Sequence, residues 1–83
     1  MNGSIDIPTI QVNIEWYLKE NYHGKIDAMD WESAEDGTLR LLLYRNAVQS
    51  VLVLTKKDLR NYSHKGWERL FERKLRSIIK DDQ

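Results

Sequence analysis

Basic side chains crowd the C-terminal third of the chain, and their type and spacing point to chemistry more clearly than any other residues do. Residues 56–80 contain nine Lys and Arg side chains against three acidic ones, a net charge of +6. In a helix, four of these cations would share one face: Arg69, Arg73, Arg76 and Lys80. Four more lie just upstream: Lys56, Lys57, Arg60 and Lys65. Because arginine suits bidentate contacts with phosphate or carboxylate groups, this basic ridge is a candidate surface for an anionic partner.

An ordinary solvated helix face would account for the same cations. Glu72 lies three or four residues from Arg69 and Arg76, and pairs at these spacings stabilise a surface helix by about 0.2–0.5 kcal/mol. Basic residues in the last turn also interact favourably with the helix dipole. Both interpretations stay open, and charge runs more often serve solubility.

The remainder of the chain is acidic, so the zero net charge conceals an asymmetry. Residues 1–55 hold eight acidic side chains and four basic ones. Five of the acidic residues cluster: Asp27, Asp30, Glu32, Glu35 and Asp36. They lack the alternating ligands, turn glycine and distant glutamate of a calcium loop. We interpret them as a solvated strand edge and turn, or as a docking face for a basic partner.

Residues suited to catalysis are scattered. His23 and His64 have no carboxylate or nucleophile beside them in the sequence, and the four glycines are too far apart to form a phosphate-binding loop. The chain has no cysteine, which excludes disulfides and thiolate metal sites. We therefore expect no catalytic, cofactor or metal site and no small-molecule substrate.

The first segment fits two kinds of secondary structure. Alternating apolar residues from Ile10 to Leu18 are typical of a strand, whereas Ile10, Ile14 and Leu18 also share one helical face. We predict a helix over residues 8–22. A helix would leave Val12 and Trp16 on the outer side as a candidate partner surface, whereas a strand would bury Trp16.

Turn residues divide the middle of the chain into three strands. Asp36-Gly37 between residues 25–33 and 38–45 predicts a hairpin. A second short turn at Asn46-Ala47 leads to residues 48–54, whose apolar character predicts the central or best-covered strand.

Two helices are predicted after the strands. Thr55 and Asp58 have the spacing of a capping box, which predicts a short helix. A longer helix capped by Ser63 would run to about Lys80, with its apolar residues at three- and four-residue steps.

These elements predict a small single α+β domain over residues 5–80. Its α-β-β-β-α order implies a three-stranded antiparallel meander with helices packed on one face. Residues 1–4 and 81–83 would be flexible termini.

The element order resembles that of double-stranded-RNA-binding domains, which also place basic residues at the start of the last helix. This chain differs in its acidic loop at residues 34–37, in an extra short helix near residues 56–62, and in bulky residues where that family has small alanines. No binding residue is transferred from the family.

The expected function is that of a non-catalytic binding module that contacts another protein or a second copy of itself. A thin core, the Val12/Trp16 stripe and the segregated charge support this hypothesis. The alternative is nucleic-acid binding through the basic ridge. No membrane partner is expected, and a chain without cysteine, leader or long apolar run is expected in the cytoplasm.

Overall fold

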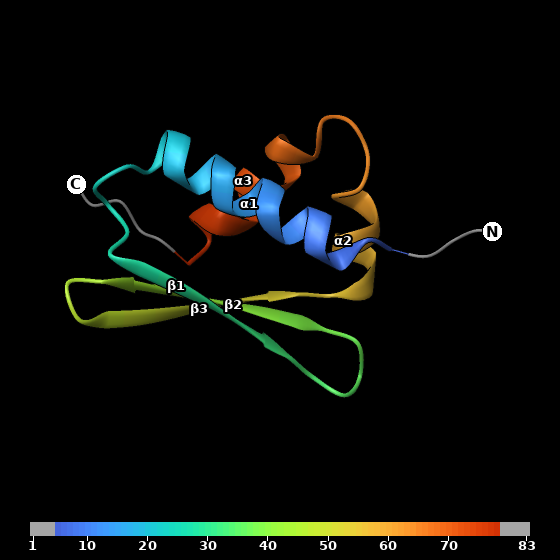
Figure 1. Cartoon of the computed structure of the whole chain (residues 1–83), viewed down its shortest axis with the longest axis horizontal. Coiled ribbons are helices and arrows are strands. Elements are labelled where there is room, and N and C mark those ends of the chain that lie inside the picture. The colour runs from blue at the N-terminus through green and yellow to red at the C-terminus, as the bar shows by residue number, and fades with distance from the viewer. Residues whose placement is uncertain (1–4, 79–83) are drawn as a thin grey trace.

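The computed structural model describes residues 5–78. Its elements are α1 (Ile7–Asn21), β1 (Ala28–Ser33), β2 (Leu39–Arg45), β3 (Val48–Leu54), α2 (Lys56–Asn61) and α3 (Trp67–Arg76). The strands form an antiparallel meander, and the three helices cover one of its faces (Figure 1). The predicted α+β class and α-β-β-β-α order are therefore confirmed. The helices of this part of the chain are all too short or too polar to cross a membrane.

The first segment is a helix, so its interpretation as a strand is wrong. Asp6 caps the helix, since its carboxylate accepts hydrogen bonds from the backbone N–H of Thr9 at 3.2 Å and from the Thr9 hydroxyl at 2.7 Å. A stripe with a four-residue period faces the sheet and is buried: Ile10, Ile14 and Leu18. The helical period prevails because it gives α1 one continuous apolar face.

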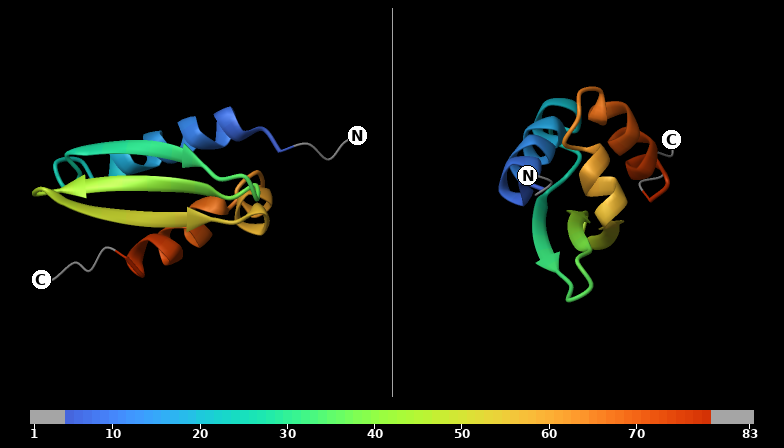
Figure 2. Two further views of the ribbon diagram at one scale, coloured as in Figure 1. Left: turned by 90° about the horizontal axis from the view of Figure 1, so that it is seen from below. Right: turned by 90° about the vertical axis from the view of Figure 1, so that its right-hand side faces the viewer.

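The core lies between the helices and the sheet. Alternate residues of β2 and β3 point toward the helices, and α3 contributes Phe71 and Leu75, which are both completely buried. Within the helical layer, α1 lies over the edge strand β1, and α3 lies on the side of the other edge strand, β3 (Figure 2). The sheet residues at the centre of this core are Leu39, Leu41, Leu43, Leu52 and Leu54.

The prediction that residues 48–54 form the central strand is wrong. The strand order is β1-β2-β3, so β2 is central and β3 is an edge. Two short turns force this order, because each strand then pairs with the next one along the chain. On the face away from the helices, Val51 and Val53 are each 42% exposed, while Leu42 of β2 is only 8% exposed. The apolar run of β3 therefore has leucines on the face that the helices cover, and Val51 and Val53 on the face that they leave uncovered.

The last helix starts later than predicted, because Ser63 does not cap it. The Ser63 hydroxyl donates a hydrogen bond to the carbonyl of Arg60 at 2.6 Å and so closes the end of α2. The chain then turns at Gly66, whose φ of +84° is a left-handed conformation that glycine adopts without strain. The helix proper ends at Arg76, and Lys80 and Ile79 lie outside the described residues.

The turn between β2 and β3 carries strain that a substitution can relieve. Asn46 and Ala47 have φ values of +50° and +67°, and a two-residue hairpin turn with both values positive favours Asn-Gly. Asp27 supports the turn, since its carboxylate accepts a hydrogen bond from the Asn46 N–H at 2.8 Å.

Replacing Ala47 with glycine is expected to raise the free energy of unfolding by about 0.5–1 kcal/mol, because glycine lacks the Cβ that opposes positive φ. Urea denaturation measures the change. The matched control is Ala28→Gly, which lies at an exposed position within β1 and should lower stability instead. If both substitutions changed the free energy of unfolding equally, the backbone at Ala47 would not be strained.

Candidate interaction surfaces

The outer face of α1 exposes two large apolar side chains one turn apart. Val12 is 51% exposed and Trp16 is 60% exposed, so both point away from the buried stripe of this helix. Exposed tryptophan is unusual on a small domain because its indole buries a large apolar area in any contact. The helical interpretation of this segment therefore leads to an exposed aromatic surface.

A shallow hollow of about 330 Å³ lies beside these residues. Met29 of β1 forms its floor together with α1, and its lining is Val12, Glu15, Trp16, Lys19 and Met29. Glu15 is fixed there, because its carboxylate accepts a hydrogen bond from Trp31 Nε1 at 2.8 Å. A second hollow of about 360 Å³ on the other side of Trp16 reaches Tyr17 and Trp67. The indole of Trp16 thus stands between two depressions.

The predicted basic ridge is divided between several environments. Arg69 and Arg73 are exposed on α3, and neither belongs to an ion pair within residues 5–78. Arg76 is also exposed, but its Nε donates a hydrogen bond to Glu72 at 2.8 Å. Lys80 lies outside the described residues.

The upstream cations are exposed on α2 and the turn after it, and one of them turns toward the sheet. A Cβ added to Gly37 would clash with Lys56 Cε, so the Lys56 side chain rests on the β1–β2 hairpin. That hairpin carries Glu35 and Asp36. The remaining three are Lys57, Arg60 and Lys65. Of the seven predicted cations within residues 5–78, Arg76 is therefore bonded to Glu72 and Lys56 rests on the hairpin, while the others are exposed.

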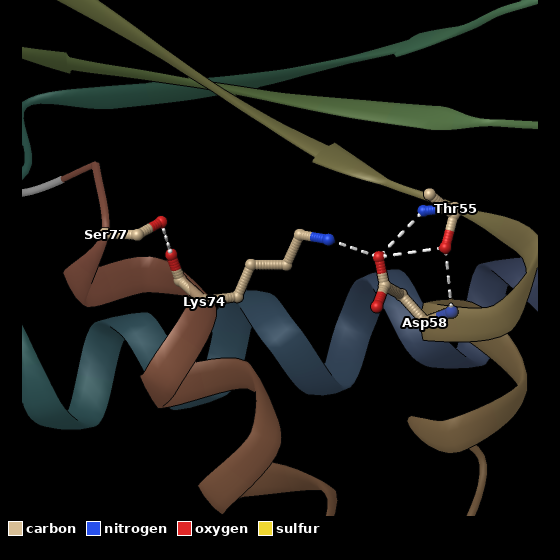
Figure 3. Close-up of polar contacts among 4 residues, drawn as sticks. All are labelled: Thr55, Asp58, Lys74 and Ser77. Carbon is tan, nitrogen blue, oxygen red and sulfur yellow. Dashed lines mark hydrogen bonds and ion pairs between the residues drawn. The ribbon is translucent and has the colours of Figure 1, made fainter.

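Asp58 links β3, α2 and α3. Its carboxylate accepts hydrogen bonds from the Thr55 N–H at 2.9 Å and from the Thr55 hydroxyl at 3.1 Å, and it forms an ion pair with Lys74 of α3 (Figure 3). The Asp58 N–H in turn bonds to the Thr55 hydroxyl at 3.2 Å, which completes the predicted capping box. Burial raises the pKa of Asp58, but the bonds from Lys74 and Thr55 outweigh it and lower this pKa below its usual value. The aspartate thus stays charged and anchors α3.

A second carboxylate, Glu72, joins α1 to α3. It accepts hydrogen bonds from the Tyr17 hydroxyl at 2.5 Å, the Tyr22 hydroxyl at 2.6 Å and Arg76 Nε at 2.8 Å. Only 19% of its side chain is exposed. No local pattern in the sequence predicts this cluster, because its tyrosines lie 50 and 55 residues from Glu72. Glu72 was expected to pair with arginines on its own helix, and this is what Arg76 does.

The same cluster shifts three ionisation equilibria. Burial raises the pKa of Glu72, yet the hydrogen bonds from Tyr17, Tyr22 and Arg76 together bring it below its usual value. Burial and the hydrogen bond to Glu72 raise the pKa of Tyr22 to about 12 and raise that of Tyr17 further. At neutral pH the glutamate is therefore charged and both tyrosines are neutral donors. This arrangement holds helices together and offers no free nucleophile.

The acidic residues of the sheet have structural partners. The Asp36 carboxylate accepts hydrogen bonds from the N–H and hydroxyl of Thr38 at 3.0 and 2.8 Å, and Glu32 lies 3.5 Å from Arg40. Asp30 accepts from the Trp31 N–H at 2.9 Å. Glu35 is exposed in the hairpin turn. Within residues 5–78, histidine, aspartate and glutamate side chains nowhere gather as a group of three that could hold a metal ion.

Both histidines are exposed, at the turn after α1 and at the turn after α2, so they lie in separate loops. The comparison of the chain with protein-family models, curated proteins and solved structures finds no match to any of them. A proposal for the function is therefore argued from the surfaces of the chain itself.

Proposed function

We propose that this protein is a non-catalytic binding module that associates with a second copy of itself through the outer face of α1. The observation that carries the proposal is the pair of exposed apolar side chains, Val12 and Trp16, one helical turn apart. Tryptophan is the residue most enriched among those that dominate interface energies. A domain of this size also gains from covering such a surface, because its own core is thin.

The charges around Trp16 support a second copy as the partner. Glu15 and Lys19 lie on the same edge of the hollow, one turn apart and with opposite charge. When two α1 helices cross antiparallel about a twofold axis near residue 17, Glu15 of each copy lies opposite Lys19 of the other. The face is thus complementary to itself, and each Trp16 would lie near a hollow of the other copy.

Light scattering behind a sizing column, over a series of protein concentrations, tests the proposal. The wild-type chain is expected to change from monomer to dimer as its concentration rises. Trp16→Gln should weaken this association about 30-fold or more, because a central tryptophan contributes about 2 kcal/mol or more to such an interface. The matched control is Val48→Thr, which changes the most exposed valine, on the edge strand β3, and should leave the mass profile unaltered. A wild-type chain that stays monomeric at every concentration contradicts the proposal.

Nucleic-acid binding has less support from the arrangement of the cations. A duplex-binding ridge needs several unpaired cations in line with a phosphate backbone. Arg76 is instead bonded to Glu72, Lys74 is paired with Asp58, and Lys56 rests on the acidic hairpin. On α3 itself this leaves Arg69 and Arg73 as the unpaired cations among the described residues, a short surface, so protein contact is the function that we propose. Location in the cytoplasm belongs to the same proposal.

A further inference from the structure

One flank of α1 carries amide, aromatic and acidic side chains beside the start of α3. Residues three and four apart on a helix are neighbours on its surface, and five residues of α1 follow this spacing: Asn13, Trp16, Tyr17, Glu20 and Asn21. Helices α1 and α3 share one side of the sheet (Figure 2), and the ring centroids of Tyr17 and Trp67 lie 5.7 Å apart. Together with Trp67 and Glu68, the five residues line the shallow hollow of about 360 Å³, which we call the α1–α3 hollow.

Three aromatic rings line this hollow, and two of them are held in place. The Tyr17 hydroxyl donates a hydrogen bond to Glu72 at 2.5 Å, and the Tyr17 ring packs edge-on against the buried Phe71. Trp67 packs against the core with its plane inclined by 61° to that of Tyr17. The third ring is that of Trp16, which is 60% exposed. Because a cation is attracted to the face of an aromatic ring, most strongly to tryptophan, the α1–α3 hollow suits a positively charged group.

Both charged side chains in the lining are acidic. Glu20 and Glu68 are exposed, and neither belongs to an ion pair within residues 5–78. The Asn21 amide nitrogen donates a hydrogen bond to the Tyr17 carbonyl at 2.9 Å, so its amide oxygen is left as an acceptor. Lysine and arginine take no part in the lining among the residues that the structure describes. The carboxylates therefore add a negative potential to a surface that already suits a cation.

The hollow on the opposite side of Trp16 suits a cation less well. Its lining includes Lys19, which would repel a second positive charge, and the Glu15 carboxylate there already accepts the indole N–H of Trp31. Among the described residues, the two hollows share Trp16 alone. A site for a cation between α1 and α3 is therefore distinct from the surface proposed for self-association.

Arginine combines the properties that this lining requires. Its planar guanidinium stacks on aromatic faces and at the same time presents five N–H donors, which bond to carboxylates in pairs. A lysine ammonium is more strongly hydrated and has no plane to stack on an indole. The hollow is shallow and Trp16 is exposed, so a free cation would have to offset its whole loss of freedom with a few contacts. A side chain of a bound protein is held by the contacts around it as well.

We propose that the α1–α3 hollow binds an arginine side chain of a partner protein. The guanidinium would lie against the indoles of Trp67 and Trp16 and would bond to the carboxylates of Glu20 and Glu68. The partner is thus a protein that presents an exposed arginine on its binding surface. This site does not rest on self-association through α1, because Trp67 and Glu68 lie on α3.

The tripeptide acetyl-Gly-Arg-Gly-amide is the probe, and the same peptide with citrulline is its control, because citrulline has nearly the shape of arginine without the charge. Spectra of the ¹⁵N-labelled full chain, recorded by NMR at constant ionic strength and at a concentration that gives a monomer, report the site. Millimolar arginine peptide should shift the indole N–H resonances of Trp67 and Trp16 and leave the amide of Val53, on the uncovered face of the sheet, unchanged. The citrulline peptide should bind about tenfold more weakly, and a lysine peptide about threefold more weakly.

Variants of the two carboxylates test the charge. Glu20→Gln and Glu68→Gln should each weaken binding of the arginine peptide about threefold, because a single exposed ion pair contributes little, and the double variant about tenfold. The matched control is Glu35→Gln, which removes the same charge from the exposed turn between β1 and β2 and should bind as the wild type does. All three glutamates are exposed, so these substitutions should leave the fold intact.

Two variants of α1 separate this site from the surface for self-association. Trp16→Leu replaces the ring with an apolar side chain and should weaken binding of the arginine peptide about threefold. Val12→Gln changes the lining of the other hollow only, so it should weaken self-association and leave peptide binding unchanged. If the wild-type chain stays monomeric at every concentration and still binds the arginine peptide at Trp67, the proposed association fails and the cation site stands.

The proposal is overturned by absent binding throughout the millimolar range, by equal binding of the arginine and citrulline peptides, by tighter binding of the lysine peptide, or by equal effects of Glu68→Gln and Glu35→Gln. Shifts of Trp67 as large as those from the peptide, in concentrated protein without peptide, would identify a second copy as the occupant and would likewise overturn it.

Discussion

Replacing Phe71 with alanine is expected to lower the free energy of unfolding by about 3–5 kcal/mol. The ring is completely buried and meets three other aromatic rings edge-on or tilted. Its centroid lies 5.6 Å from that of Tyr17, 5.9 Å from Tyr62 and 5.9 Å from Trp67. The substitution would leave a cavity where α1, α2 and α3 meet. Since a domain of this length has roughly 4–12 kcal/mol of stability, much of the variant should be unfolded at 37 °C.

The matched control for Phe71→Ala is Leu70→Ala on the same helix. Leu70 is 40% exposed, so its truncation should cost no more than about 1 kcal/mol. Urea denaturation followed by circular dichroism measures both variants. If Leu70→Ala were the more damaging substitution, α3 would have to be rotated from the orientation described above.

The second large effect is expected at Glu72. Glu72→Leu leaves the hydroxyls of Tyr17 and Tyr22 without their shared acceptor in a partly buried place, and should lower the free energy of unfolding by about 2–4 kcal/mol. The control is Glu68→Ala, one turn earlier on α3, which is exposed and makes no hydrogen bond in the described chain. Its effect should stay within about 0.5 kcal/mol. Equal effects of the two variants would mean that the Glu72 cluster contributes nothing to stability.

The pH dependence of stability carries a separate signature of this cluster. Because the folded pKa of Glu72 is lowered, its contribution is present above the unfolded value of about 4.3 and is lost as the pH falls through the folded value. The pKa of Tyr22 is raised to about 12, so its contribution is present below the unfolded value of about 10 and is lost as the pH rises toward 12. Urea midpoints of the wild type should fall in both ranges, and those of Glu72→Leu should fall less. If the urea midpoints of the two proteins changed in parallel with pH, the Glu72 cluster would not be the source of this pH dependence.

Local patterns in the sequence were enough to predict most of the elements. The i, i+4 stripe of Ile10, Ile14 and Leu18 predicted α1, and Asp36-Gly37 predicted the first hairpin. The spacing of Thr55 and Asp58 predicted the capping box that starts α2. Each of these signals lies within a few residues of chain, where spacing and turn chemistry dominate.

Features that depend on distant segments were not predicted. Val48–Leu54 is apolar like a central strand, yet its position is decided by the two turns, and Val51 and Val53 face the side of the sheet that no helix covers. The start of α3 was misplaced, because Ser63 has the right residue type for a cap but is used to close α2. No periodicity connects Glu72 with the tyrosines of α1.

The candidate site follows the same division. That Val12 and Trp16 share an outer face followed from the helical period alone, whereas the hollow beside them needed Met29 of β1 to be brought under α1. The cations were likewise visible in the sequence. The partner of Arg76 follows from helical spacing, because Glu72 lies four residues before it, whereas the partner of Lys74 depends on tertiary structure.

The most direct measurement of the α1 interface is a dilution series followed by the three indole N–H resonances of the chain in ¹⁵N-resolved NMR spectra. Trp16 is 60% exposed, whereas Trp31 donates its indole N–H to Glu15 and Trp67 packs against the core, so the largest change is expected at Trp16. Self-association through α1 predicts that the Trp16 resonance shifts with protein concentration far more than those of Trp31 and Trp67. A Trp16 resonance that is constant from dilute to concentrated protein, or a concentration dependence confined to β3, would contradict it.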